Sequence, residues 1–92
     1  MIQSFKCPFT HDLFAGREVP RFVNIRRVAE RKLQMLHRAV MLEDLRIPPN
    51  NRLEALSKDR KGQHSIRVND RWRVCFEWRD GHAWKVEIVD YH

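Results

Sequence analysis

The sequence has little of what marks secreted and membrane proteins. Its 92 residues include only two cysteines, Cys7 and Cys75, too few for the disulfide framework of a small secreted domain. The longest apolar run, residues 39–42, is far shorter than the ~18 residues that a membrane-spanning helix needs. Residues 1–6 lack the layout of a signal peptide. We therefore expect a cytoplasmic protein with reduced thiols.

Glycine and proline are scarce as well, with three and four residues respectively. The sequence shows no linker, repeat or low-complexity segment. Hydrophobic residues make up 42% of the chain, which is too apolar for an intrinsically disordered protein. A chain of this length has room for one core, so we expect a single domain over residues 1–92.

The charge is strongly positive. The chain has 18 basic and 12 acidic residues, a net charge of +6, and most of the basic residues are arginine. The excess lies in the middle of the chain, with 7 − 3 = +4 over residues 21–46 and 8 − 5 = +3 over residues 47–80. Guanidinium groups bind phosphates through forked hydrogen bonds, which favours a nucleic acid. Net charge alone fits an acidic protein or an anionic membrane surface equally well.

Two helices are predicted from apolar spacing and flanking residues. Thr10 is expected to cap a short helix that ends at Gly16. After Pro20, apolar residues at intervals of three and four predict a long helix over residues 21–46 that ends before Pro48. These apolar residues are Phe22, Ile25, Ala29, Leu33, Leu36 and Val40. The helix's basic residues are expected to lie mostly toward solvent, and they are Arg26, Arg27, Arg31, Lys32 and Arg38.

The C-terminal part of the chain changes to a period of two, which is typical of half-buried strands. Turn signals separate three such segments and predict an antiparallel meander over residues 63–90. Short strands are expected at residues 2–6 and 52–56. The fold class is therefore α+β, an antiparallel sheet packed against one short and one long helix.

Strand parity constrains the register, because residues opposite each other in an antiparallel pair point to the same face. In the last hairpin, pairing Trp78 with Trp84 places both on the covered face together with Trp72, and brings Arg71 beside Tyr91. His64 has the same apolar parity, so we interpret it as a packed residue rather than a ligand.

In the preceding hairpin the same argument places Arg67 opposite Arg73 on the exposed face. Like charges in that position destabilise a sheet unless an anion lies near them, so we expect an anion site there. The last three residues, Asp90, Tyr91 and His92, arrive at the same end of the sheet. This cluster combines phosphate-binding groups with a carboxylate, an aromatic ring and a titratable imidazole.

Cleavage of RNA needs few groups beyond these. The 2′-hydroxyl attacks the adjacent phosphate, so the protein removes one proton, stabilises charge on the phosphate and protonates the leaving oxygen. We expect Arg73 and Arg67 to hold the phosphate and His92, with Asp90 nearby, to exchange protons. Tyr91 is expected to stack on a base or to donate a hydrogen bond.

Several motifs of the chain resemble HigB toxins of the RelE/ParE superfamily. They are residues 52–56, 59–62, 65–68 and 72–74 and the ending Asp90-Tyr91-His92. The resemblance implies a RelE-like microbial RNase fold and functional roles for Arg73, Asp90, Tyr91 and His92. Arg67 matches a positively charged position on the corresponding strand of RelE-type members. Some of these toxins have a catalytic histidine where Glu54 stands here, so the base is Glu54 or His92. Further candidates for binding phosphate are Arg71, Lys58, Arg60 and Lys61.

The resemblance also implies an activity and its partners. It indicates a type II toxin that cleaves translated mRNA in the ribosomal A site and is neutralised by a HigA-type helix-turn-helix antitoxin, which itself binds operator DNA. No metal, organic cofactor or membrane belongs to that mechanism. The alternative is a non-catalytic protein, either a gyrase poison of the ParE branch or a basic binding module. The antitoxin is expected on the basic side of the helix 21–46 or on the sheet edge near residues 52–56.

Overall fold

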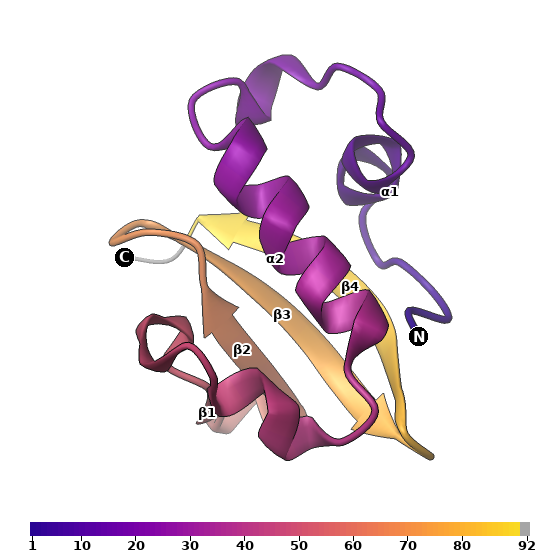
Figure 1. Cartoon of the computed structure of the whole chain (residues 1–92), viewed down its shortest axis with the longest axis vertical. Helices are drawn as coiled ribbons and strands as arrows, with labels where there is room; N and C mark the ends of the chain where they lie inside the picture. The colour runs from indigo at the N-terminus through magenta and orange to yellow at the C-terminus, as the bar shows by residue number, and fades with distance from the viewer. Residues whose placement is uncertain (91–92) are drawn as a thin grey trace.

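An antiparallel sheet of four strands, in the order β1-β2-β3-β4, organises the chain (Figure 1). The computed structural model describes residues 1–90. The strands are β1 (Glu54–Ala55), β2 (Gln63–Arg67), β3 (Trp72–Arg79) and β4 (His82–Asp90). The predicted meander and the edge strand near residues 52–56 are thus confirmed, and so is the α+β class.

Two helices, α1 (Pro8–Phe14) and α2 (Arg26–Arg38), pack on one face of this sheet (Figure 1). The predicted limits 21–46 of the long helix are wrong at both ends. Pro20–Phe22 form a separate 3-10 turn, η1, and Leu42–Arg46 form another, η2. The helix ends at Arg38 because the carboxylate of Asp44 accepts the N–H groups of residues 40 and 41 and starts η2 instead. Val40, expected on the buried face, is exposed.

The N-terminal segment differs from the prediction in two details. Thr10 does not cap α1, which starts at Pro8; its buried hydroxyl accepts the N–H of Ile88 at 3.0 Å and so ties the helix to β4. The predicted strand at residues 2–6 consists of two isolated parallel bridges to β4, at Ile2 and Phe5. Gly16 follows α1 with a φ of +87°, as expected for a residue that ends a helix.

The hydrophobic core lies between α2 and the sheet. Apolar residues of α2 pack there against alternate residues of the strands, and the largest fully buried ones include Leu33, Leu36, Ile66, Val74, Phe76 and Val86. His64 points to the same side, where its ring stacks on Phe76 at a centroid distance of 6.1 Å and burial lowers its pKa. The interpretation of His64 as a packed residue is confirmed.

Lys32 on α2 was expected to lie toward solvent, and this is wrong. Only 6% of the residue is exposed, and its ammonium donates a hydrogen bond to Asn51 Oδ1 at 2.5 Å. Asn51 is fully buried in the 3-10 turn η3 (Pro49–Asn51), and its amide also donates to the carbonyl oxygen of Leu45. Desolvation lowers the pKa of Lys32, and the positive charges of Arg31 and Arg67 add to that effect.

The register of β2 and β3 agrees with the prediction. Ile66 pairs with Val74, and Arg67 pairs with Arg73. The parity argument succeeds here because these strands alternate without interruption between the core and the opposite face.

The register of β3 and β4 agrees with the prediction only in the half of the hairpin that lies away from its turn. Arg73 pairs with Val89 as predicted, but Trp78 pairs with Ala83 and not with Trp84. The two-residue turn Asp80-Gly81, with positive φ at both residues, fixes the register at its own end of the hairpin. A bulge in β4 with Lys85 at φ 53° then restores the alternation. Trp84 therefore lies on the opposite face from Trp78, which corrects the prediction that the three tryptophans share the covered face.

Candidate active site

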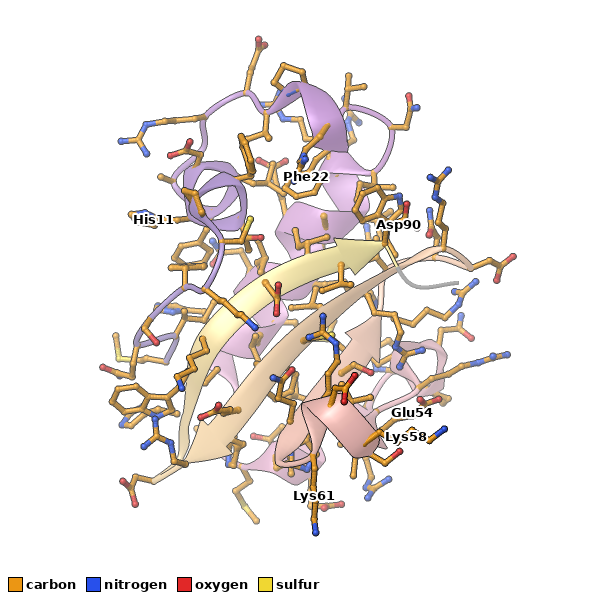
Figure 2. All side chains as sticks on the ribbon, turned by 180° about the vertical axis from the view of Figure 1, so that it is seen from behind. His11, Phe22, Glu54, Lys58, Lys61 and Asp90 are labelled. Atoms are coloured by element: carbon orange, nitrogen blue, oxygen red, sulfur yellow. The ribbon has the colours of Figure 1, made fainter. Side chains whose placement is uncertain are left out.

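The sheet face turned away from α2, here called the open face, carries polar and charged residues. Figure 2 shows this side, with the strands in front of the helices. Residues that share the face by register include Glu54, Ser65, Arg67, Arg73, Cys75 and Glu87. Cys75 is fully buried among its neighbours, and desolvation raises the pKa of its thiol. The burial of this thiol on a largely polar face indicates that the flanking charged side chains lie over it.

Arg73 is held at the centre of the open face. Its Nε donates to Ser65 Oγ at 2.8 Å, and its Nη2 donates to the carbonyl oxygen of Arg52 at 2.7 Å. Its Nη2 also lies 3.9 Å from Glu54 Oε2. The side chain of Arg73 is only 12% exposed, whereas that of Glu54 is 55% exposed. The structure thus brings together two predicted site residues, a guanidinium and a carboxylate.

Arg67 lies opposite Arg73 and has its own acidic partner. Its Nη2 donates to Asp70 Oδ1 at 2.5 Å, and this hydrogen bond lowers the pKa of the Asp70 carboxyl. The Asp70 side chain is 99% exposed. The predicted pairing of like charges is therefore present, and it is compensated within the protein, by Asp70 on one arginine and by Glu54 and a carbonyl on the other.

Arg71 and Asp90 form a forked ion pair at the end of β4. The Nε of Arg71 lies 2.9 Å from both carboxylate oxygens, and its Nη2 lies 2.7 Å from Oδ2. This hydrogen bonding raises the pKa of Arg71. Figure 2 places Asp90 at the tip of the strand. Tyr91 and His92, with which Arg71 and Asp90 were expected to act, lie outside the described residues.

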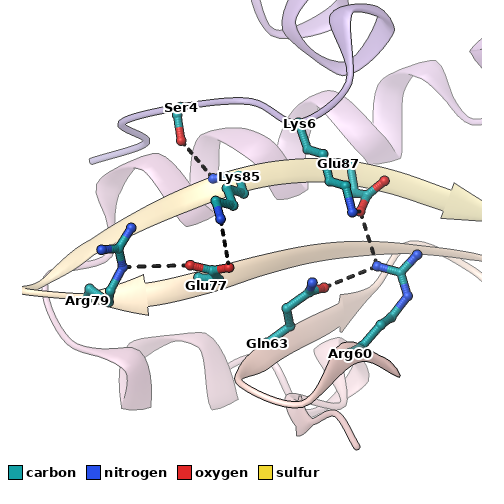
Figure 3. A network of polar contacts seen from close by, with 8 residues as sticks. All are labelled: Ser4, Lys6, Arg60, Gln63, Glu77, Arg79, Lys85 and Glu87. Atoms are coloured by element: carbon teal, nitrogen blue, oxygen red, sulfur yellow. Dashed lines mark hydrogen bonds and ion pairs between the residues drawn. The ribbon is translucent and has the colours of Figure 1, made fainter. Parts of the chain in front are cut away.

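Arg60 joins the loop after β1 to the sheet (Figure 3). Its Nη1 donates to Gln63 Oε1 and to Glu87 Oε2, both at 3.1 Å. Lys6 also contacts Glu87 Oε2, at 3.5 Å. Arg60 was predicted to bind phosphate; in the structure it anchors the 3-10 turn η4 (Lys58–Arg60) to β2 and β4.

The two lysines of this loop are exposed. Lys58 opens the 3-10 turn η4 with a φ of 56°. Lys61 projects outward from the loop in Figure 2, well away from Asp90.

Two contributors to the site were missed from the sequence, Ser65 and the main-chain carbonyl of Arg52. Ser65 could have been found, because it stands diagonally across from Arg73 in the predicted register. The carbonyl could not, since Arg52 presents it from a left-handed backbone conformation with φ 44° and ψ 58° that no residue pattern indicates.

Among residues 1–90 no three His, Cys, Asp or Glu side chains gather closely enough to hold a metal ion together. In the same part of the chain no helix has the length and apolar character to cross a membrane. A surface pocket lined by residues 18–20, Val23 and Arg26 contains none of the predicted site residues.

Residues 9–92 match the family model described as RelE-like toxin of type II toxin-antitoxin system HigB. The chain belongs to this HigB family. It is 53% identical over 53 residues to Toxin HigB-1 of Vibrio cholerae, a segment that covers 58% of this chain and 56% of that protein. It is 37% identical over 57 residues to an uncharacterized protein of Haemophilus influenzae, covering 62% of this chain and 56% of the other. The matches thus span little more than half of each relative.

The fold has a solved counterpart. A chain of the YoeB-YefM complex from Staphylococcus aureus superposes on this HigB-family chain with a TM-score of 0.61 and 16% sequence identity. The superposition covers 100% of this chain and 98% of the other. At that identity the likeness shows the fold. The expected HigB family is confirmed by the family model, and the expected RelE-like fold agrees with this solved counterpart.

Proposed function

We propose that this toxin is an endoribonuclease that cleaves translated mRNA on the ribosome. The observation that carries the proposal is the placement of Arg73, fixed on the open face beside Glu54 and opposite Arg67. A phosphate bound there meets two guanidinium groups, and a carboxylate that can accept a proton lies next to them.

The proposed reaction needs no reactant beyond the RNA itself. The 2′-oxygen attacks the adjacent phosphorus and loses its proton to a base, and the 5′-oxygen leaves with a proton from an acid. The products are a 2′,3′-cyclic phosphate and a 5′-hydroxyl. Arg73 and Arg67 stabilise the charge that develops on the phosphate oxygens. Because the RNA supplies the nucleophile and side chains supply the positive charge and the proton transfers, we propose that the reaction is metal-independent.

The proton-transfer groups are proposed from two sources. Glu54 is one, since its carboxylate is exposed and 3.9 Å from Arg73. His92, together with Tyr91, is the other, on the resemblance of the chain's ending to the family's motif. Asp90 is proposed to act through Arg71, to which it is bonded, by holding that guanidinium at the rim of the site. Arg71, Lys58, Arg60 and Lys61 add positive charge for the RNA backbone.

We further propose that a HigA-type antitoxin neutralises the toxin and that the ribosomal A site presents the mRNA. Membership of a type II toxin family supports an antitoxin partner, and the solved counterpart is a complex of YoeB with YefM. The net charge of +6 suits both an acidic antitoxin segment and an RNA-rich partner.

The test is primer extension on an mRNA incubated with the toxin, with and without translating ribosomes. Cleavage that requires ribosomes supports the proposal. A gyrase-linked DNA cleavage assay is run in parallel, because a ParE-like gyrase poison would be positive there and would leave the mRNA intact. That second pattern would contradict the proposed activity.

A further inference from the structure

The hydroxyl of Ser65 is in an unusual position for a serine in a small domain. Ser65 lies in the middle of β2 and is fully buried, yet it is on the polar open face. It pairs with Cys75, so Arg73 is its diagonal neighbour on β3. Its oxygen accepts the Nε–H of Arg73 at 2.8 Å. A buried hydroxyl with a charged donor is a strong and directional contact.

Two contacts define the plane of the Arg73 guanidinium. Ser65 Oγ accepts a hydrogen bond from Nε, and the carbonyl oxygen of Arg52 accepts one from Nη2. A guanidinium is a rigid planar fork. Hydrogen bonds from two of its nitrogens to fixed acceptors therefore leave the group little freedom to rotate or shift. The third nitrogen, Nη1, has no hydrogen-bond partner among residues 1–90. The Arg73 side chain keeps 12% of its surface exposed, so a ligand on the open face can reach the group.

We propose that Ser65 is a positioning residue for catalysis. It orients Arg73 so that the Nη1 edge faces the scissile phosphate, and it touches no reacting atom itself. This inference rests on the proposed function. Positioning of this kind matters because a displacement of about 1 Å in a catalytic group costs on the order of 100-fold in rate.

A spectroscopic experiment tests the orientation without any substrate. The Nε–H resonance of Arg73 in a ¹⁵N-labelled protein should exchange slowly with water in the native toxin, because Ser65 shields and bonds it. Ser65→Ala should bring this exchange to the rate of an exposed arginine, and Ser65→Thr, which keeps the hydroxyl, should preserve the protection. Ser4→Ala is the matched control: Ser4 Oγ also accepts a hydrogen bond at 2.8 Å, from the N–H of Lys85, and it does not contact Arg73.

A kinetic experiment tests the consequence. With toxin in excess over ribosomes stalled on mRNA, Ser65→Ala should lower the maximal cleavage rate by about 10- to 100-fold and change the half-saturating toxin concentration by less than about twofold. Ser65→Thr should recover most of the rate, and Ser4→Ala should leave it unchanged. Chemical unfolding of each variant is measured alongside, to check that the folded fraction is the same under assay conditions.

The outcomes separate the two proposals. If the unmodified toxin does not cleave mRNA, the proposed function is wrong. If Arg73 Nε–H remains protected in Ser65→Ala, or if that variant cleaves at the full rate, the positioning role of Ser65 is wrong while the function stands.

Discussion

Arg67 and Arg73 lie directly opposite each other in the β2–β3 ladder, and each has an oxygen partner within the protein. The partners of the two arginines differ in how far they are exposed to solvent. The partners of Arg73 are a buried hydroxyl and a main-chain carbonyl, whereas the carboxylate that pairs with Arg67 is almost entirely exposed. An incoming phosphate can therefore displace Asp70 from Arg67 at little cost, while Arg73 keeps its orientation.

Arg73 is expected to be the most sensitive residue of the site. Arg73→Ala should lower the mRNA cleavage rate by about 100-fold or more, because it removes a preorganised cation from the phosphate. Arg79→Ala on the same strand is the control, since Arg79 is exposed at the far end and stacks on Trp84. Full activity of Arg73→Ala on translating ribosomes would contradict the assigned role.

The pH dependence of cleavage should identify the base. If His92 accepts the proton, the rate falls below a pH of about 6.5, and His92→Gln loses that limb of the profile. If Glu54 is the base, the limb at low pH disappears in Glu54→Gln and persists in His92→Gln. His82→Gln controls for the loss of a histidine elsewhere. Profiles unchanged in both site variants would exclude both assignments.

Asp70 is expected to oppose RNA binding. Asp70→Asn should tighten binding of a short single-stranded RNA by about two- to fivefold at low salt, because it leaves the positive charge of Arg67 unopposed, and the gain should shrink as salt rises. Asp80→Asn is the matched control: it also neutralises an exposed acid in a hairpin turn, and asparagine tolerates the φ of 55° found there. Equal effects from the two substitutions would point to net charge alone.

The buried Lys32 should make stability depend on alkaline pH. Its pKa is lowered in the folded state, so the unfolded chain binds more protons between that lowered value and the ordinary lysine value of about 10.4. The free energy of unfolding contributed by this group therefore rises with pH across that window and is lost as pH falls through it. Lys32→Met should reduce this rise, as measured by urea unfolding at several pH values. Lys85→Met, at an exposed lysine, should leave the slope as it is.

Much of the fold follows from local pattern. The alternation in residues 63–90 predicts the meander and also the pairing of Arg67 with Arg73, because a shift by one residue would turn Ile66 and Val74 out of the core. The long helix is less predictable at its ends. Apolar spacing continues past Arg38, but the Asp44 carboxylate competes for the free N–H groups and wins locally.

The candidate site was predicted in its residue types and less well in its contacts. Parity indicates which side chains share the open face, and this suffices for Arg73 and Arg67, whereas Glu54 was expected from the family resemblance alone. It says nothing about the partner of each, so the pairing of Asp90 with Arg71 and of Arg60 with Glu87 emerges only from the coordinates. The assigned roles of Asp90 and Arg60 depend on such long-range pairing.

The bulge at Lys85 has a practical consequence for experiments in solution. Because it turns one indole outward while Trp72 and Trp78 pack against the core, the emission of Trp84 reports on events at the surface beside Glu77. Replacing Trp84 by phenylalanine would subtract that signal and leave the other two as gauges of the interior. A docking protein and a loosening of the core would thus be told apart in one fluorescence titration.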